Sequence, residues 1–332
     1  MNILKNAQLL ICLLAISFMV GCAGTEETPQ PNNGGSGGNG NGNPTPTVAN
    51  CTDPLATNYN KDATTDDCGC TYTTNGKVPE TIPASITQKV LIEEFTGTWC
   101  GYCPSGAKSV HDAELKYPNQ VIGIGIHYRD KMETRMFAHL ETILGNINSF
   151  PGATFNRKAF NGSKVSHPGN SNRNSGQIIN NTTSPKLGIA IETNVNSSNE
   201  VEVLTYVGIK EKGEYAITVY LIEDKVVGQG RGYDQANYHN DNSSSPFYQK
   251  GNPIKGYEHN ATLRDILTDL NGFELPTCGQ DADKIYKRMF KLKLDDSYNK
   301  DNCRIVAFVT DKTSKEVINS QVVKVGETQA WN

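Results

Sequence analysis

Hydrophobic and polar positions change their spacing along the chain, and this spacing predicts the elements. The apolar run at 90–95 predicts a strand, and the nearly continuous apolar run at 121–128 is typical of a buried parallel strand. Between them, apolar side chains recur at helical spacing, at Ala107, Val110, Ala113 and Tyr117. This segment predicts an amphipathic helix that ends at Pro118. The order strand, helix, strand predicts a βαβ unit.

A second helical pattern and then a series of strands follow. Apolar residues at helical spacing predict a helix over 132–144. From Lys186 the pattern changes to short apolar runs, at 187–191, 201–204, 215–222, 290–294, 305–309 and 317–325. In one of these runs Lys291 and Lys293 alternate with apolar residues, which indicates one buried and one solvated face. Several short strands between turn signals predict an antiparallel β-sandwich.

Polar segments divide the chain into domains. Residues 22–50 are rich in Gly, Asn, Pro and Thr and predict a tether, because they have little apolar surface to bury. Residues 162–184 are rich in Asn, Ser and Gly, and the domain boundary is expected at Ser184–Pro185. We therefore expect an α/β domain over 85–183 and an all-β sandwich domain over 185–330.

The N-terminus has the pattern of an export signal. Lys5 provides the positive region, and Leu9–Val20 provides an apolar region that is too short to favour a transmembrane span. The segment ends in Val20-Gly21-Cys22, which resembles a bacterial lipoprotein cleavage box. This resemblance implies that residues 1–21 are removed and that Cys22 carries the lipid. Ordinary signal cleavage is the alternative.

Composition narrows the choice of partners and compartment. The chain has 332 residues and a net charge of −4, and its predicted strands carry charges of both signs. We therefore expect no nucleic-acid partner. Of the nine cysteines, Cys12 lies in the predicted signal and Cys22 is the predicted lipid site. Export places the other seven in an oxidising compartment, where disulfides persist.

The candidate chemistry lies in Trp99-Cys100-Gly101-Tyr102-Cys103-Pro104, directly after the first predicted strand. A Cys-x-x-Cys that opens a helix places its first sulfur at the positive helix end, where a thiolate is favoured. The two-residue spacer allows Cys103 to resolve a mixed disulfide on Cys100. With its strand, tryptophan and proline, the stretch resembles the W-C-x-x-C site of the thioredoxin superfamily.

Two other interpretations of the cysteine pair stay open. The pair fits a permanent structural disulfide. It also fits half of a zinc site, which requires a second pair of Cys or His ligands. The nearest histidines, His111, His127 and His139, show no such spacing.

The thioredoxin resemblance implies two further catalytic residues. Glu94 lies six positions before Cys100, where thioredoxins carry a buried carboxylate that moves protons. Glu93 and Glu94 point to opposite faces of the strand, so one of them points inward, where a raised pKa suits proton transfer. The alternative is that both are solvated. Pro151 matches the cis-proline that faces the cysteine pair in thioredoxin-like folds, and an ordinary trans peptide bond is its alternative.

A small module spans residues 51–72. It resembles a short Cys-Asp-Pro…Asn-Tyr…Asp-Asp…Cys repeat of secreted Bacteroidota proteins, and this resemblance implies a disulfide between Cys51 and Cys70. Asn58, Asn60 and Asp62 alternate like the first ligands of a calcium loop, although the glycine and the closing glutamate of an EF-hand are missing. A solvated, disulfide-pinned spacer without a metal is therefore the favoured interpretation, and calcium binding is the alternative. No other cofactor is expected.

The number of cysteines in each region suggests how the remaining ones pair. Cys278 and Cys303 are alone in the sandwich region, so they are expected to form a structural disulfide. Cys68 is then left over, either free or in competition for Cys51.

The order of the modules resembles the outer-membrane lipoprotein family of the Bacteroidota that is named for a twenty-eight-kilodalton member. The resemblance rests on the lipoprotein box, the tether, the Trp99–Pro104 site and the motif His259–Arg264. That motif lies in a polar, Tyr-rich insertion, 228–271, which we expect to cover one end of the sandwich. The implied fold is a thioredoxin-like α/β domain followed by a β-sandwich.

Two functions fit this architecture in an outer-membrane lipoprotein, facing the periplasm or the cell surface. One is a thiol–disulfide oxidoreductase, a reductase or isomerase, whose partners are the thiols or disulfides of exported proteins. The other is a surface adhesion or binding lipoprotein in which the Cys100–Cys103 disulfide is structural. In both cases the N-terminal lipid provides the contact with the membrane.

Overall fold

The computed structural model describes residues 47–332. The predicted signal segment 1–21, the lipidation site Cys22 and most of the tether 22–50 therefore lie outside the described residues. Among the described helices, none has the length and the apolar character that a membrane crossing requires.

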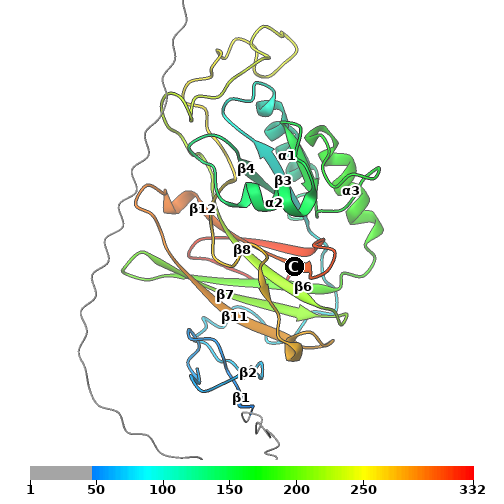
Figure 1. Cartoon of the computed structure of the whole chain (residues 1–332), viewed down its shortest axis with the longest axis vertical. Coiled ribbons are helices and arrows are strands. Elements are labelled where there is room, and N and C mark those ends of the chain that lie inside the picture. Colours follow the sequence, from blue (N-terminus) through cyan, green and yellow to red (C-terminus); the bar gives the residue numbers. More distant parts are fainter. Residues whose placement is uncertain (1–46) are drawn as a thin grey trace, which may run out of the picture. The chain divides into compact units, whose positions relative to one another are not determined.

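The predicted βαβ unit is present and carries the Cys-x-x-Cys (Figure 1). Strand β3 (Val90–Thr96) runs parallel to β4 (Val121–His127), and helix α1 (Cys103–Lys116) connects them. Strand β5 (Gly152–Phe155) pairs antiparallel with the other edge of β3. The other helical segments of this region are α2 (Met136–Leu144), the short 3-10 helix η1 (Pro168–Asn170) and α3 (Ser171–Asn181).

Alternating side chains explain how the helices cover this part of the sheet. Val90 and Ile92 of β3 pack in one buried cluster with residues of α1 and α3. Leu91 and Phe95 of the same strand pack in another cluster with residues of α2. Because neighbouring residues of a strand point to opposite faces, the apolar residues of β3 contribute to both clusters.

The second half of the chain forms the predicted antiparallel strands. The long ones are β6 (Leu187–Val195), β7 (Glu200–Ile209), β8 (Tyr215–Glu223), β11 (Ile285–Lys293), β12 (Cys303–Asp311) and β13 (Val317–Lys324). The short strands β10 (Phe273–Glu274) and β14 (Thr328–Gln329) pair with β8 and β6, and the 3-10 helix η3 (Lys300–Asn302) leads into β12. Side chains from all six long strands form one buried apolar cluster, which confirms the all-β part of the predicted fold.

One sheet runs through both regions. Within residues 47–332 its strand order is β13-β12-β8-β9-β4-β3-β5, with β10 beside β8, and a second sheet has the order β11-β7-β6-β14. Strand β9 (Thr262–Ile266) makes the connection, because it is antiparallel to β8 and pairs in parallel with β4 through Gly125 and Thr262. The first sheet therefore crosses the predicted boundary at Ser184–Pro185, and the motif His259–Arg264 lies where its two halves meet.

The small module is pinned by its own disulfide. Cys51 and Cys70 are bonded, as expected, and strands β1 (Ala49–Asn50) and β2 (Thr65–Asp66) pair beside them. The buried carboxylate of Asp53 accepts hydrogen bonds from the Tyr72 hydroxyl at 2.7 Å and from the Met289 N–H of β11 at 3.1 Å. The module is therefore packed on the second sheet.

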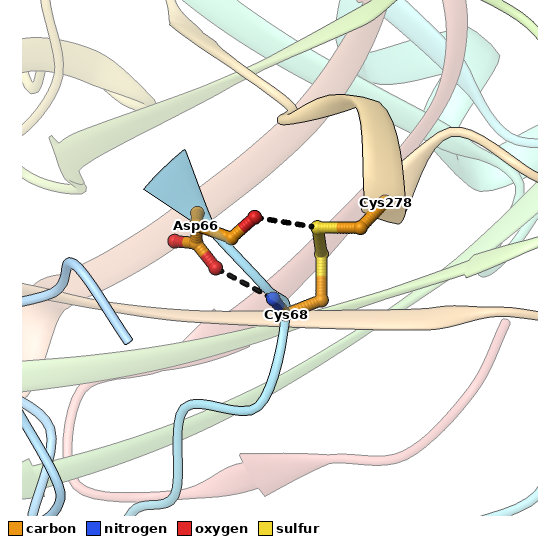
Figure 2. Close-up of side chains that lie close together, drawn as sticks. All are labelled: Asp66, Cys68 and Cys278. Atoms are coloured by element: carbon orange, nitrogen blue, oxygen red, sulfur yellow. Dashed lines mark hydrogen bonds between the residues drawn. A yellow bond between two sulfur atoms is a disulfide. The ribbon is translucent and has the colours of Figure 1, made fainter. Parts of the chain in front are cut away.

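The predicted disulfide between Cys278 and Cys303 is wrong. Cys278, in the 3-10 helix η2 (Thr277–Gly279), is bonded to Cys68 of the small module, as Figure 2 shows, and Cys303 is a free, buried thiol. The Asp66 carboxylate accepts the Cys68 N–H at 2.7 Å, and the Asp66 carbonyl oxygen lies 3.2 Å from Cys278 Sγ. Cys303 opens β12 and packs in the sandwich core, where burial raises the pKa of its thiol to about 12. Counting cysteines by domain failed because the module and the sandwich share a disulfide.

Candidate functional site

The loop between β3 and α1 holds the two cysteines at the helix N-terminus. Cys103 is the first residue of α1, and its N–H donates a hydrogen bond to the Cys100 carbonyl at 3.2 Å. The two cysteines form a disulfide with their Cα atoms 5.3 Å apart. Both are buried, with 5% and 1% of their surface exposed. The first turn of α1 carries no acidic residue to oppose the positive potential of the helix end.

The carboxyl of Glu94 lies against the first turn of α1. A Cβ atom at Gly106 would lie 2.4 Å from Glu94 Oε1 and 2.6 Å from Pro151 Cβ, so this glycine allows the helix to approach both residues. Among the described residues, Glu94 Oε1 is buried without a hydrogen-bond partner. Burial raises the pKa of this carboxyl well above its usual value. The carboxyl can therefore exchange a proton under conditions where an exposed glutamate is ionised.

Glu93 has the opposite environment on the other face of β3. Its carboxylate accepts two hydrogen bonds from the Arg157 guanidinium, both at 2.8 Å, and lies 3.5 Å from the Tyr220 hydroxyl. Glu93 and Glu94 are 0% and 4% exposed, which excludes the alternative that both are solvated. Of these two buried acids, Glu94 is the one without a compensating cation.

Pro151 lies at the start of β5 and is joined to Phe150 by a cis peptide bond, as expected. The ring of Phe150 lies 5.0 Å from the ring of Trp99 and 5.7 Å from the ring of Tyr128. The Trp99 indole N–H donates a hydrogen bond to the Tyr128 carbonyl at 2.7 Å. These aromatic contacts hold the proline loop beside the loop that carries the cysteines.

The insertion between β8 and β9 contacts the cysteine loop, and its expected place over one end of the sandwich is wrong (Figure 1, yellow segment). The Ala236 N–H donates to the Thr98 carbonyl at 2.7 Å, and the Tyr238 N–H donates to the Gly101 carbonyl at 2.9 Å. The Tyr238 ring covers Gly101, where a Cβ atom would lie 2.3 Å from the ring. The insertion has no apolar periodicity, so its place depends on such hydrogen bonds and ring contacts, which a hydrophobic pattern does not reveal.

Gln235 is the buried anchor of this contact, with 2% of its surface exposed. Its side-chain nitrogen Nε2 lies 2.9 Å from the Cys100 carbonyl oxygen, 3.1 Å from that of Ala236, 3.3 Å from that of Thr98 and 3.4 Å from that of Gly97. One side-chain amide thus bridges the insertion and the loop that carries Cys100.

A cavity of about 670 Å³ lies beside the disulfide. Its lining brings together Glu94, Cys103, His127, Tyr257 and His259. Tyr257 and His259 come from the insertion, so the polar lining is built by both halves of the chain. Water in such a cavity can carry protons between a buried carboxyl and solvent.

The histidines of the cavity belong to a hydrogen-bonded network. His127 Nδ1 lies 2.7 Å from an Asp130 carboxylate oxygen, which also accepts the Thr98 N–H at 2.9 Å. Burial opposes ionisation of Asp130, but the interaction with His127 and the N–H donors of Met132 and Thr98 together outweigh it and hold the pKa of Asp130 below its usual value. His259 packs on His127 with ring centroids 5.2 Å apart, and burial lowers the pKa of His259 to about 4. His259 is therefore neutral near pH 7.

The calcium candidates lie in the small module, apart from the cysteine pair. Asn58 donates to the Gly69 carbonyl and accepts the Thr71 N–H, both at 2.8 Å. Asn60 accepts the N–H of Asp62 at 3.0 Å. The side-chain oxygens of both asparagines are thus engaged in backbone turns of the module.

The zinc interpretation requires a cluster of ligands. Within residues 47–332, the group of three or more His, Cys, Asp or Glu side chains close enough to share an ion is Asp66, Cys68 and Cys278. Its two sulfurs are bonded to one another (Figure 2), so neither is a thiolate ligand. Neither Cys100 nor Cys103 belongs to such a group in this part of the chain.

The sequence identified one side of the site and missed the other. Cys100, Cys103, Glu94 and Pro151 lie together around the first turn of α1. The insertion contributes Gln235, Tyr257 and His259, none of which was assigned to this site. The insertion reaches this region because β9 pairs in parallel with β4 through Thr262 and Gly125, and the sequence alone does not specify that pairing.

Comparison with known proteins identifies a family. A family model described as outer membrane protein Omp28 matches residues 144–329, more than half of the chain. The match begins after the Cys-x-x-Cys, so the cysteine pair lies outside it. Among curated protein sequences, none matches this chain.

Solved structures resemble the chain at low sequence identity. HBP35 of Porphyromonas gingivalis superposes with a TM-score of 0.56 and 20% identity over 73% of this chain and 77% of that one, which shows a similar fold. A protein of Agrobacterium tumefaciens has a TM-score of 0.45 and 12% identity, over 74% of this chain and 98% of that one. A domain of the outer membrane lipoprotein Omp28 from P. gingivalis has a TM-score of 0.27 and 17% identity, over 42% of this chain and 88% of that domain.

Proposed function

The chain belongs to the Omp28 family of outer membrane proteins, and we propose that it is a lipid-anchored thiol–disulfide oxidoreductase acting on exported proteins as a reductase or isomerase. The observation that carries this proposal is the unpaired, buried carboxyl of Glu94 against the helix turn that begins with Cys103. A purely structural disulfide does not require such a group, and a buried carboxyl without a hydrogen-bond partner lowers the stability of the fold. A disulfide that exchanges with substrates does need a nearby proton acceptor.

The surroundings of the pair support the same proposal. A parallel βαβ unit, an antiparallel strand beside it and a proline at the start of that strand resemble the arrangement in thioredoxin-like folds. The positive end of α1 favours a thiolate on Cys100, and burial of Cys103 shields the second sulfur. No Lys, Arg or His separates the two cysteines, so the pKa of Cys100 should be lowered only moderately. This favours a reductase or isomerase over a strong oxidant.

The proposed reaction consists of two sulfur exchanges. The Cys100 thiolate of the reduced protein attacks one sulfur of a substrate disulfide, a bond forms between these two sulfurs, and the other substrate sulfur leaves as a thiolate. Cys103 then gives its proton to the Glu94 carboxylate and attacks Cys100 Sγ. The Cys100–Cys103 disulfide forms, and the first substrate sulfur leaves as a thiolate. The two electrons come from the cysteine pair, and a dithiol partner at the membrane must supply them again.

Glu94 suits its role because of its environment. Proton transfer is efficient when donor and acceptor have similar pKa values. An exposed glutamate is far more acidic than a thiol, whereas burial brings the pKa of Glu94 towards that of a cysteine. Pro151 lies against the same helix turn, and its proposed role is to contact the substrate backbone beside Cys100.

Turnover tests the proposal directly. The wild-type protein should reduce insulin with a dithiol as the electron source and should reactivate scrambled ribonuclease. Cys100→Ala should abolish both activities, whereas Cys303→Ala, which changes a cysteine of the sandwich core, should retain them. Failure of the wild-type protein in both assays would contradict the proposal.

A surface binding function is the second candidate. It is favoured by the cover over the site: Cys100 is only 5% exposed and the Tyr238 ring lies on Gly101. Under this function the Cys100–Cys103 disulfide is a permanent staple. It should then stay oxidised in a glutathione buffer that reduces ordinary redox-active pairs.

The lipid anchor is part of the proposal and rests on Cys22, outside the described residues. Cys22→Ser should move the protein from the membrane fraction to the soluble fraction. A variant that still sediments with membranes would show that another feature anchors it.

A further inference from the structure

The loop that carries Cys100 is held from two sides. On one side, the Asp130 carboxylate accepts the N–H of Thr98 at 2.9 Å. On the other side, the Gln235 side-chain amide lies within hydrogen-bond distance of three carbonyl groups of the same loop, those of Gly97, Thr98 and Cys100. In the loop before Cys100, an N–H group is therefore bound by Asp130 and the carbonyl groups lie within hydrogen-bond distance of Gln235.

Gln235 reaches this position from outside the βαβ unit. It lies in the insertion between β8 and β9, more than one hundred residues after Cys100, and is 2% exposed. Its closest loop contact, 2.9 Å, is with the carbonyl oxygen of Cys100 itself. The same oxygen accepts the Cys103 N–H at 3.2 Å, so the first turn of α1 and Gln235 share one acceptor.

The amide affects the electrostatics of the pair. Each carbonyl oxygen carries a partial negative charge, and three of them converge on one buried point next to Cys100. Each of these oxygens also accepts one main-chain N–H, from Cys100, Ala236 and Cys103, and the two N–H donors of Gln235 add to this compensation in a region of low dielectric, where dipoles act strongly. With fewer donors, the oxygens would disfavour a negative charge on the neighbouring sulfur.

We propose that Gln235 is a positioning residue for the Cys100–Cys103 pair, and that its side-chain amide makes the pair easier to reduce by binding the carbonyl groups of the Cys100 loop. The inference rests on the thiol–disulfide exchange proposed above. It adds that the insertion, a part of the chain outside the βαβ unit, sets the redox balance of that site.

The test compares reduction potentials. The mature full-length protein and its Gln235→Met variant, which has a side chain of similar length without N–H donors, are equilibrated with glutathione buffers of graded ratio. The fraction of reduced Cys100–Cys103 is read by thiol alkylation. The thiolate absorbance of the reduced protein, compared with that of its Cys100→Ala counterpart, gives the pKa of Cys100.

Gln235→Met should shift the equilibrium about five- to tenfold towards the disulfide and raise the pKa of Cys100, the effect expected for about one lost hydrogen bond. Gln235→His, whose ring N–H can still donate, should stay close to the wild-type protein. Asn237→Leu is the matched control, because the Asn237 amide donates within the insertion, to the Phe247 and Gly251 carbonyls at 2.9 and 3.0 Å. It should lower thermal stability without an equal shift in potential.

Two results would overturn the inference. One is an unchanged potential in Gln235→Met. The other is an equal shift in Asn237→Leu, which would show that any loosening of the insertion has the same effect. If Gln235→Met does not fold, Gln235→Asn takes its place in the comparison. Its side chain is one methylene shorter, so its amide lies farther from the carbonyl groups of the Cys100 loop. A wild-type pair that glutathione does not reduce would instead contradict the proposed function, so the two failures are distinguishable.

Discussion

Glu93 and Glu94 are adjacent in sequence, and their different surroundings give them different chemistry. Both carboxylate oxygens of Glu93 accept hydrogen bonds from the Arg157 guanidinium, so this buried acid has a cationic partner. Glu94 has no such partner among the described residues, and burial alone decides its pKa. At the scale of single residues, the site therefore depends on an acid that is left uncompensated beside a disulfide.

Glu94→Gln tests this assignment through the pH dependence of stability. The folded-state pKa of Glu94 lies above its unfolded value, so the wild-type carboxyl opposes unfolding at low pH. As the pH rises above about 4.5, the unfolded state loses this proton first, and the wild-type protein loses stability relative to the variant. The difference in unfolding free energy should therefore move in favour of Glu94→Gln between pH 4 and pH 8.

The same variant should react more slowly. Because the amide cannot accept a proton, release of substrate from Cys100 by Cys103 should slow at least about tenfold. Stopped-flow kinetics and urea unfolding at several pH values provide the two measurements. A variant with wild-type kinetics and an unchanged pH dependence of stability would show that the pKa of Glu94 is not raised and that Glu94 takes no part in proton transfer.

At the scale of elements, the insertion between β8 and β9 changes an exposed cysteine loop into a covered one. Its main-chain hydrogen bonds from Ala236 and Tyr238 run along the loop, and the Tyr238 ring closes on Gly101. Tyr238 is itself 62% exposed, so a single surface side chain separates Gly101 from solvent on this side. A change that displaces it should expose the disulfide.

Gly101→Ala is the smallest such change. The added Cβ would lie 2.3 Å from the Tyr238 ring, so the ring must move. Reduction of Cys100–Cys103 by a small dithiol should then be faster, by about fivefold per 1 kcal/mol of lost contact. Gly125→Ala is the control, because its Cβ would meet its nearest neighbour at an ordinary 3.7 Å. Equal rates in all three proteins would show that the insertion does not limit access.

How much the sequence predicts depends on which forces place a segment. The runs at 90–95 and 121–128 and the helical spacing between them specify β3, β4 and α1, because burial of apolar side chains decides those elements. Gln235 and Tyr238 lie in a polar segment whose position follows from hydrogen bonds to one particular loop. The partner of Cys278 likewise depends on how the small module packs on the sandwich, and no local pattern encodes that contact.

At the scale of the whole molecule, one sheet and one disulfide tie the regions together. Strand β9 joins the βαβ unit to the sandwich, and Cys68–Cys278 joins the small module to η2 across 210 residues of chain. Both links connect parts that the sequence pattern separates into domains. The site is therefore supported by residues from both sides of Ser184–Pro185.

Cys278→Ala should measure the disulfide link. Loss of a crosslink that closes so long a loop should lower the free energy of unfolding by about 2–4 kcal/mol. Cys303→Ala, which removes a buried thiol but no crosslink, should cost about 1 kcal/mol. Denaturant unfolding compares the two, and peptide mapping identifies the bonded cysteines. A Cys278–Cys303 peptide in the wild-type digest would contradict the pairing described here.

The central claim is that Cys100 exchanges disulfides with exported proteins, and trapping of a mixed disulfide tests it most directly. Cys103→Ala leaves Cys100 without its resolving partner, so substrates should stay covalently attached. Expressed in its own cell envelope, this variant should yield adducts on non-reducing gels that disappear on reduction and are missing from Cys100→Ala,Cys103→Ala. Cys103→Ala without adducts, at wild-type abundance and with a free Cys100 thiol, would contradict the account.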